Sequence, residues 1–223
     1  MNKNIAIDGP AGAGKSTIAK RVAKEIGAVY VDTGAMYRAV ALYLLRNKVS
    51  EDDNEAIGRV CQGARVTIAY EDGVQQVYLN GENVSGLIRT EEVSRMTSIS
   101  STNEAVRALL LDLQRDLAKT TQVVMDGRDI GTNVLPDARV KIYLTASVET
   151  RAKRRFKELT AKGEACELGE IEAMIRERDE RDMNRKLAPL KQAEDAVLVD
   201  TSDMNIEEVT ERLIAIYKEA VGE

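Results

Sequence analysis

The chain has 223 residues, which is long enough for one sizeable core and too short for two full domains. Its net charge of −5 excludes a global basic field of the kind that binds nucleic acid or an acidic membrane surface. Histidine is absent, which excludes imidazole as a general base, nucleophile relay or metal ligand.

The first predicted elements are a short strand, a glycine-rich loop and a helix. An apolar run at residues 5–7 precedes GPAGAGKST, which fills every fixed position of the phosphate-loop pattern G-x-x-x-x-G-K-[ST]. Helical spacing follows in Ile18, Ala19, Val22, Ala23 and Ile26. A glycine-rich turn that matched by chance would not need this strand and helix context.

The loop chemistry suits a nucleoside triphosphate. Glycines let backbone N–H groups wrap the phosphates, Lys15 meets the β and γ phosphates, and the hydroxyl of Ser16 is the predicted ligand of Mg²⁺. The predicted ATP-binding residues are Gly9, Pro10, Ala11, Gly12, Ala13, Gly14, Lys15, Ser16 and Thr17.

Four further strand-like runs alternate with helical patterns along the chain, at residues 29–31, 123–125, 140–144 and 197–199. Compact apolar strands separated by helices are typical of a parallel sheet that is covered on both faces, so the fold class is α/β. Residues 101–104 and 205–208 resemble capping boxes and predict two helix starts.

Residues 64–86 break this alternation. The stretch ARVTIAYEDGVQQVYLNGENVSG has a period of two and turn signals at Asp72-Gly73 and Asn80-Gly81. It predicts a small antiparallel hairpin or three-stranded sheet, either as a surface decoration or as part of substrate enclosure.

Three arginine-bearing clusters are candidates for a second substrate site: DTGAMYR at residues 32–38, DGRD at 126–129 and RDERDMNR at 178–185. The first two follow predicted strands, and ligands of open parallel sheets bind beyond the carboxyl ends of strands. Arginine suits a phosphate because its planar fork grips two oxygens. Two alternatives stay open: Arg178 and Asp182 as a solvated i,i+4 pair, and Asp126 as a Mg²⁺-side carboxylate.

A basic run at residues 151–157 also has two interpretations. It is either a solvated helix face or a mobile lid that brings arginines to the transferring phosphoryl group, with a flexible break at Lys162-Gly163. The candidate lid arginines are Arg151, Arg154 and Arg155.

Taken together, GPAGAGKST, DTGAMYR, DGRDIGT and RERDERDMNRKLAPL resemble the bacterial cytidylate kinases in order and spacing, over essentially the whole chain. The resemblance implies a P-loop kinase fold with a five-stranded parallel sheet flanked by helices, a small antiparallel β insertion and a helical lid. We expect one P-loop kinase unit over residues 1–223, with a monophosphate-binding insertion near 60–92 and the lid near 151–170.

The resemblance also implies the reaction, which is transfer of the γ-phosphoryl group of MgATP to CMP or dCMP by direct in-line displacement. By motif, the acceptor phosphate is assigned to Arg38, Arg128 and Arg185, the sugar to Ser98, Arg178 and Asp182, and the cytosine to Thr33, Arg107 and Asp129. Lys15 and the three phosphate arginines form the catalytic set. The family often has serine where Thr33 stands, so the hydroxyl is kept and a methyl group is added.

The remaining expectations concern the environment and the rival functions. Cys61 and Cys166 are far apart and no secretory segment is recognised, so we expect a cytoplasmic monomer without nucleic-acid or membrane partners. The nearest rival is a P-loop kinase for UMP, AMP or shikimate. A nucleotide-gated switch is the rival from another class, although the chain has no Asn-Lys-x-Asp guanine-reading element.

Overall fold

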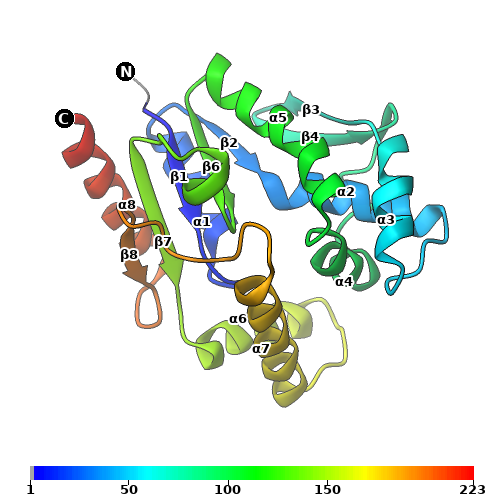
Figure 1. Ribbon diagram of the computed structural model, residues 1–223. Helices are drawn as coiled ribbons and strands as arrows, with labels where there is room; N and C mark the ends of the chain where they lie inside the picture. The colour runs from blue at the N-terminus through cyan, green and yellow to red at the C-terminus, as the bar shows by residue number, and fades with distance from the viewer. Residues whose placement is uncertain (1–2) are drawn as a thin grey trace. The chain divides into compact units, whose positions relative to one another are not determined.

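The computed structural model describes residues 3–223, which fold into two compact units (Figure 1). One unit consists of Met1–Ala28 with Val123–Glu223, and the other is Val29–Gln122. The second unit contains the inserted element predicted at residues 60–92.

The five strands of the larger sheet are all parallel, in the order β2-β6-β1-β7-β8. Their bounds are β1 (Ile5–Asp8), β2 (Val29–Asp32), β6 (Val123–Gly127), β7 (Val140–Thr145) and β8 (Val197–Asp200). Each strand begins at the apolar run that predicted it, and β1 and β6 are buried at every residue. The α/β class and the five-stranded parallel sheet are therefore confirmed.

Five helical elements belong to the same unit as β1. They are α1 (Lys15–Glu25), the π-helical turn η2 (Ile130–Val134), α6 (Val148–Ala161), α7 (Leu168–Asn184) and α8 (Ile206–Val221). Helix α1 packs on β1 and β6, and α8 packs on α1 and β7. The capping box predicted at residues 205–208 is confirmed, because Asn205 and Glu208 exchange both hydrogen bonds at the start of α8.

Helices α6 and α7 form a hairpin and lie side by side (Figure 1). Its apolar contacts form a small cluster of Ala152, Leu159, Ile171 and Ile175. Glycine allows the chain to leave α6, since Gly163 adopts a φ of +76° directly after the helix. The α6–α7 hairpin therefore has a core of its own.

The second unit contains four α-helices and a short 3₁₀ turn besides β2. They are α2 (Thr33–Arg46), α3 (Asn54–Val60), η1 (Cys61–Gly63), α4 (Glu91–Ser100) and α5 (Glu104–Thr120). Helix α2 contacts α4 and α5, around buried side chains such as Met36 and Met96. The helix start predicted at residues 101–104 is present, but its cap is Asn103, whose side chain accepts from Ala105 N and Val106 N, and Ser101 ends α4 instead.

The predicted antiparallel insertion is confirmed as a separate three-stranded sheet in the order β3-β4-β5. Its strands are β3 (Val66–Glu71), β4 (Val74–Leu79) and β5 (Glu82–Asn83). The pairs Asp72-Gly73 and Asn80-Gly81 have positive φ at all four residues, as tight hairpin turns require. The period of two and the turn dipeptides therefore located this sheet correctly.

Candidate active site

The phosphate loop connects β1 to α1, with Pro10–Gly14 as the loop and Ser16 and Thr17 in the first helical turn. The loop backbone adopts a conformation that favours glycine at three positions, because Gly9, Gly12 and Gly14 have φ of +149°, +76° and +85°. A Cβ on Gly9 would lie 1.9 Å from the carbonyl oxygen of Leu144 in β7. The loop therefore passes too close to the neighbouring strand for any side chain at this position.

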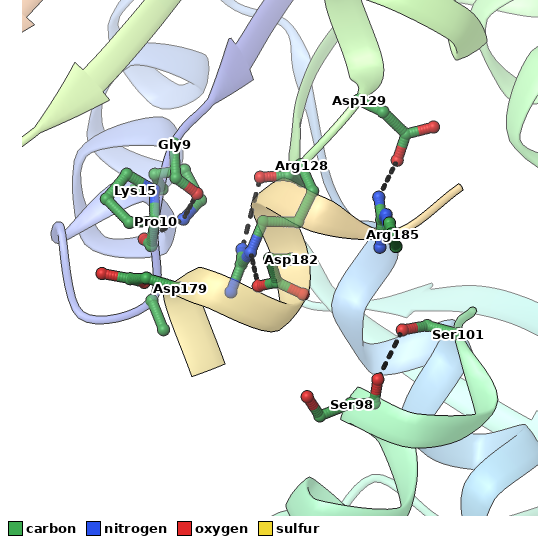
Figure 2. Close-up of polar contacts among 12 residues, drawn as sticks. Gly9, Pro10, Lys15, Ser98, Ser101, Arg128, Asp129, Asp179, Asp182 and Arg185 are labelled. Carbon is green, nitrogen blue, oxygen red and sulfur yellow. Dashed lines mark hydrogen bonds and ion pairs between the residues drawn. The ribbon is translucent and has the colours of Figure 1, made fainter. Parts of the chain in front are cut away.

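Lys15 is folded back onto the loop (Figure 2). Its Nζ donates to the carbonyl oxygens of Gly9 at 2.8 Å and Pro10 at 2.7 Å, and the residue as a whole is 6% exposed. Burial, followed by the nearby charge of Arg128, lowers the pKa of Lys15 well below its ordinary value. The negative charge of an incoming polyphosphate would oppose this shift and raise the pKa of Lys15.

Ser16 and Asp126 bring two oxygen ligands together at the end of β6. The Ser16 hydroxyl donates to Asp126 Oδ2 at 3.0 Å. Hydroxyl and carboxylate oxygens fit Mg²⁺, which in nucleotide enzymes takes few protein ligands and completes its shell with phosphates and water. Across residues 3–223 no cluster of three or more His, Cys, Asp or Glu could hold a metal alone. The chemistry of this pair therefore fits a metal that arrives with its nucleotide.

Asp8, the last residue of β1, is a site residue that motif reasoning missed. Its carboxylate accepts from the backbone N–H groups of Ile130 and Gly131, both at 2.7 Å, directly after Asp129. A Cβ on Gly131 would lie 3.2 Å from Lys141 Cδ and 3.4 Å from Asp8 Oδ2, which leaves little room for a side chain. Asp8 therefore determines where the segment after β6 turns.

The free energy of unfolding should depend on pH more strongly in the wild-type protein than in the variant Asp8→Asn, which lacks this titrating carboxyl group. Burial raises the pKa of Asp8 from 3.8 to about 6 against the two backbone hydrogen bonds, so the folded protein binds this proton more tightly than the unfolded chain. As pH rises from about 4 to about 6, Asp8 ionises in the unfolded chain before it ionises in the folded protein. The free energy of unfolding therefore falls by about 2 to 3 kcal/mol over this range. Denaturant unfolding of both proteins across this range measures the difference. A stability difference that stays constant with pH contradicts the assignment.

Two ion pairs link the segment after β6 to α7 and the residue that follows it (Figure 2). Arg128 Nε donates to Asp182 Oδ2 at 2.8 Å, and Arg185 Nη2 donates to Asp129 Oδ1 at 3.1 Å. Burial raises the pKa of Asp182, but the charges of Arg128 and Arg178 outweigh this effect and bring that pKa below its ordinary value. Asp182 is 4% exposed, so a solvated Arg178–Asp182 pair does not describe this residue.

The three arginines of the basic run in α6 lie in different environments. Arg151 is buried, donates to Ala11 O and Ala146 O at 2.9 Å each, and pairs with Asp179 Oδ2 at 2.6 Å. Arg154 donates to the carbonyl and hydroxyl oxygens of Thr201, whereas Arg155 is largely exposed beside Glu158. A solvated face therefore describes only Arg155 of the three, and Arg151 connects the phosphate loop to α7.

The other predicted residues, Thr33, Arg38, Ser98 and Arg107, belong to the second unit. Asp32 caps α2 by accepting from Ala35 N at 2.9 Å, and it pairs with Arg38 at 3.1 Å. Arg89, an arginine that the motifs did not indicate, also reaches Asp32, at 3.5 Å. Asp32 is therefore shared by two guanidinium groups.

Arg107 and Ser98 lie on α5 and α4 of this unit. Arg107 is buried, stacks over the Tyr37 ring with 5.7 Å to its centroid, and donates to Ser101 O. Ser98 is also buried, and its carbonyl accepts from the Ser101 hydroxyl (Figure 2). Thr33 begins α2 and is 3% exposed. A ligand that reached these side chains would therefore meet fixed polar groups.

Comparison with known proteins adds information that geometry lacks. A family model described as cytidylate kinase matches residues 5–219. A curated cytidylate kinase of Listeria welshimeri is 50% identical over 219 residues, covering 98% of this chain and 97% of the relative. One from Caldicellulosiruptor bescii is 48% identical over 218 residues, covering 98% and 96%. A solved structure of an uncharacterized protein from Eubacterium ventriosum aligns with a TM-score of 0.52 and 13% identity, covering 98% and 99% of the two chains, and this likeness concerns the fold alone.

Proposed function

Because the chain belongs to the cytidylate kinase family, we propose that it transfers the γ-phosphoryl group of ATP to CMP or dCMP, giving CDP or dCDP and ADP. The family match over residues 5–219 is the observation that carries this proposal. The geometry agrees with it, since a glycine loop, an inward lysine and arginine–aspartate pairs suit two phosphorylated substrates.

The donor subsite in this proposal is the loop Gly9–Thr17. Lys15 would exchange its two carbonyl partners for the β and γ phosphates, and Ser16 with Asp126 would hold Mg²⁺. Bound Mg²⁺ supplies neutralisation of charge on the β and γ phosphates. The rest of the task falls to the protein, which must align two polyanions that repel each other.

The acceptor phosphate is assigned to Arg38, Arg128 and Arg185, called the acceptor arginines below. Each pairs with one aspartate that orients the planar guanidinium and leaves other N–H groups for a ligand. Arg38 Nε is buried and makes no hydrogen bond within the described residues 3–223, which supports a ligand at this position.

The remaining acceptor contacts are proposed by motif, with Ser98, Arg178 and Asp182 for the sugar and Thr33, Arg107 and Asp129 for the cytosine. A nucleoside monophosphate is already largely dianionic near pH 7, so its oxygen attacks without a general base. This agrees with a chain that contains no histidine.

The lid is proposed to be the segment 151–170, which contains most of α6 and the start of α7. Saturating CMP with a non-hydrolysable ATP analogue should protect residues 151–165 from amide exchange more than β1 and β6, which are stable in any state. Exchange of the ligand-free protein is the reference. Equal protection throughout the chain, or none in this segment, would rule out the lid.

Acceptor-dependent release of ADP is the direct test of the proposed reaction. ADP release should depend on CMP or dCMP, whereas UMP, AMP and shikimate should replace them poorly. A rate that does not depend on any acceptor would favour the nucleotide-gated switch. A rate with UMP, AMP or shikimate that equalled the rate with CMP would favour the rival kinase.

The setting of the enzyme is proposed to be the cytoplasm, as a monomer. Both Cys61 and Cys166 are free thiols, which agrees with a reducing compartment. None of the helices in residues 3–223 has the length and hydrophobicity that a membrane span needs.

A further inference from the structure

Gln75, in the inserted sheet, binds the main chain of Asp32 with both ends of its carboxamide. Gln75 Oε1 accepts from Asp32 N at 2.8 Å, and Gln75 Nε2 donates to Asp32 O at 3.1 Å. The backbone N–H and C=O of a strand residue are normally paired with the backbone of a neighbouring strand. The glutamine side chain therefore supplies strand-like pairing at the end of β2, an edge strand of the parallel sheet.

A second side chain of the insertion supports the same strand. Tyr70 lies directly opposite Gln75 in the β3–β4 ladder, and its hydroxyl donates to the carbonyl oxygen of Tyr30 at 3.0 Å. Paired positions on one sheet face thus contact Tyr30 and Asp32, which are two residues apart on β2. The insertion is consequently attached at the point where β2 ends and α2 begins.

Asp32, which Gln75 holds by its main chain, in turn contacts Arg38. The Asp32 carboxylate accepts from Ala35 N at 2.9 Å and pairs with Arg38 Nη2 at 3.1 Å. A Cβ on Gly34 would lie 3.1 Å from Asp32 Oδ1 and 3.3 Å from Arg38 Nη1, so the carboxylate and guanidinium fill the space beside that turn. A shift of the Asp32 backbone would therefore move the guanidinium of Arg38.

We propose that Gln75 is a positioning residue for the acceptor phosphate, acting through the main chain of Asp32 and its carboxylate on Arg38. This inference rests on the proposed function only in taking Arg38 as a phosphate ligand. It gives the inserted sheet a part in acceptor binding, in place of a decorative role.

Gln75→Glu and Gln76→Glu form a matched pair of variants for the test. Glutamate at 75 keeps the size of the side chain but cannot donate to Asp32 O, and it sets a carboxylate against that carbonyl. Gln76 is the next residue of β4, faces the other side of the sheet, and accepts from Asn83 in the neighbouring strand. Both variants add one negative charge at nearly the same place.

Gln75→Glu should raise KM for CMP about tenfold, the size expected for one misplaced charged hydrogen bond, with KM for ATP within about twofold of wild type. Gln76→Glu should leave both values unchanged. If Gln75→Glu does not fold, Gln75→Met, which is neutral and of similar length, replaces it. This variant should again raise KM for CMP and leave KM for ATP within about twofold of wild type. A lower thermal midpoint with both KM values unchanged would show that Gln75 only stabilises the insertion and would overturn the proposal.

A double-mutant cycle tests the route through Arg38. In an Arg38→Met background, Gln75→Glu should raise KM for CMP no further, because the group that it positions is gone. Full additivity of the two effects would overturn the proposal. A wild-type protein that does not phosphorylate CMP would refute the proposed function instead, and the unaltered KM of a Gln75 variant in an active enzyme would refute this inference alone.

Discussion

Lys15→Met is expected to lower kcat by about 10² or more while the protein remains folded. In the proposed donor site the ammonium group would lie where charge is shared between the γ phosphate and the leaving β phosphate, so its contribution should be largest in the transition state. The loop itself should survive, because its shape depends on glycine φ angles and on hydrogen bonds to its backbone from other residues, such as that from the Arg151 side chain to Ala11 O. Steady-state kinetics with circular dichroism measures both effects.

Lys24→Met is the matched control, since Lys24 lies exposed on the same helix, nine residues from Lys15 by their numbers. It should keep the wild-type kcat. A Lys15→Met enzyme that retained more than about a third of the wild-type kcat would contradict the assignment of the loop as the phosphate cradle.

Base selectivity is the second large effect, and its basis is hydrogen-bond polarity. Cytosine presents an amino donor at N4 and an acceptor at N3, whereas uracil presents an acceptor and a donor at those positions. In the proposed cytosine site, an ionised Asp129 would only accept and Arg107 would only donate, so these two groups would suit cytosine. We expect kcat/KM for CMP to exceed that for UMP by about 10² to 10⁴.

Asp129→Ala should narrow this ratio by losing CMP activity far more than UMP activity. Because Asp129 also pairs with Arg185, some loss with both substrates is expected, and the ratio is the diagnostic quantity. Asp137→Ala removes an exposed carboxylate of the same segment and should keep the wild-type ratio. Wild-type use of UMP within about threefold of CMP, or equal loss of both in Asp129→Ala, would remove Asp129 from base recognition.

Local patterns were sufficient for the elements and the phosphate loop. The five strands were found because parallel strands buried on both faces are continuous apolar runs, as in residues 123–125. The glycines of the loop were recognisable because only glycine tolerates the φ of +149° and the close approach to β7 found at Gly9.

Long-range side-chain contacts were not recognisable in the same way. Asp8 binds the backbone of Ile130 across 122 residues, and Gln75 binds Asp32 across 43, so neither contact leaves a local pattern. Arg151 was expected among lid arginines because it belongs to a basic run. Its burial beside Asp179 depends on how α6 and α7 pack, which residue type alone does not specify.

The pairing of each acceptor arginine with an aspartate has a consequence for competing ions. Each of these guanidinium groups is paired with a carboxylate that the fold holds in place, which offsets part of its positive charge. A simple anion such as chloride gains little there, because it must compete with a carboxylate that is held in place by the fold. A phosphate ester on a correctly seated nucleotide gains more, since it can use the N–H groups that the carboxylate leaves unoccupied. If the three arginines bind the acceptor phosphate as proposed, the paired carboxylates would favour a seated nucleotide over the abundant small anions of a cell.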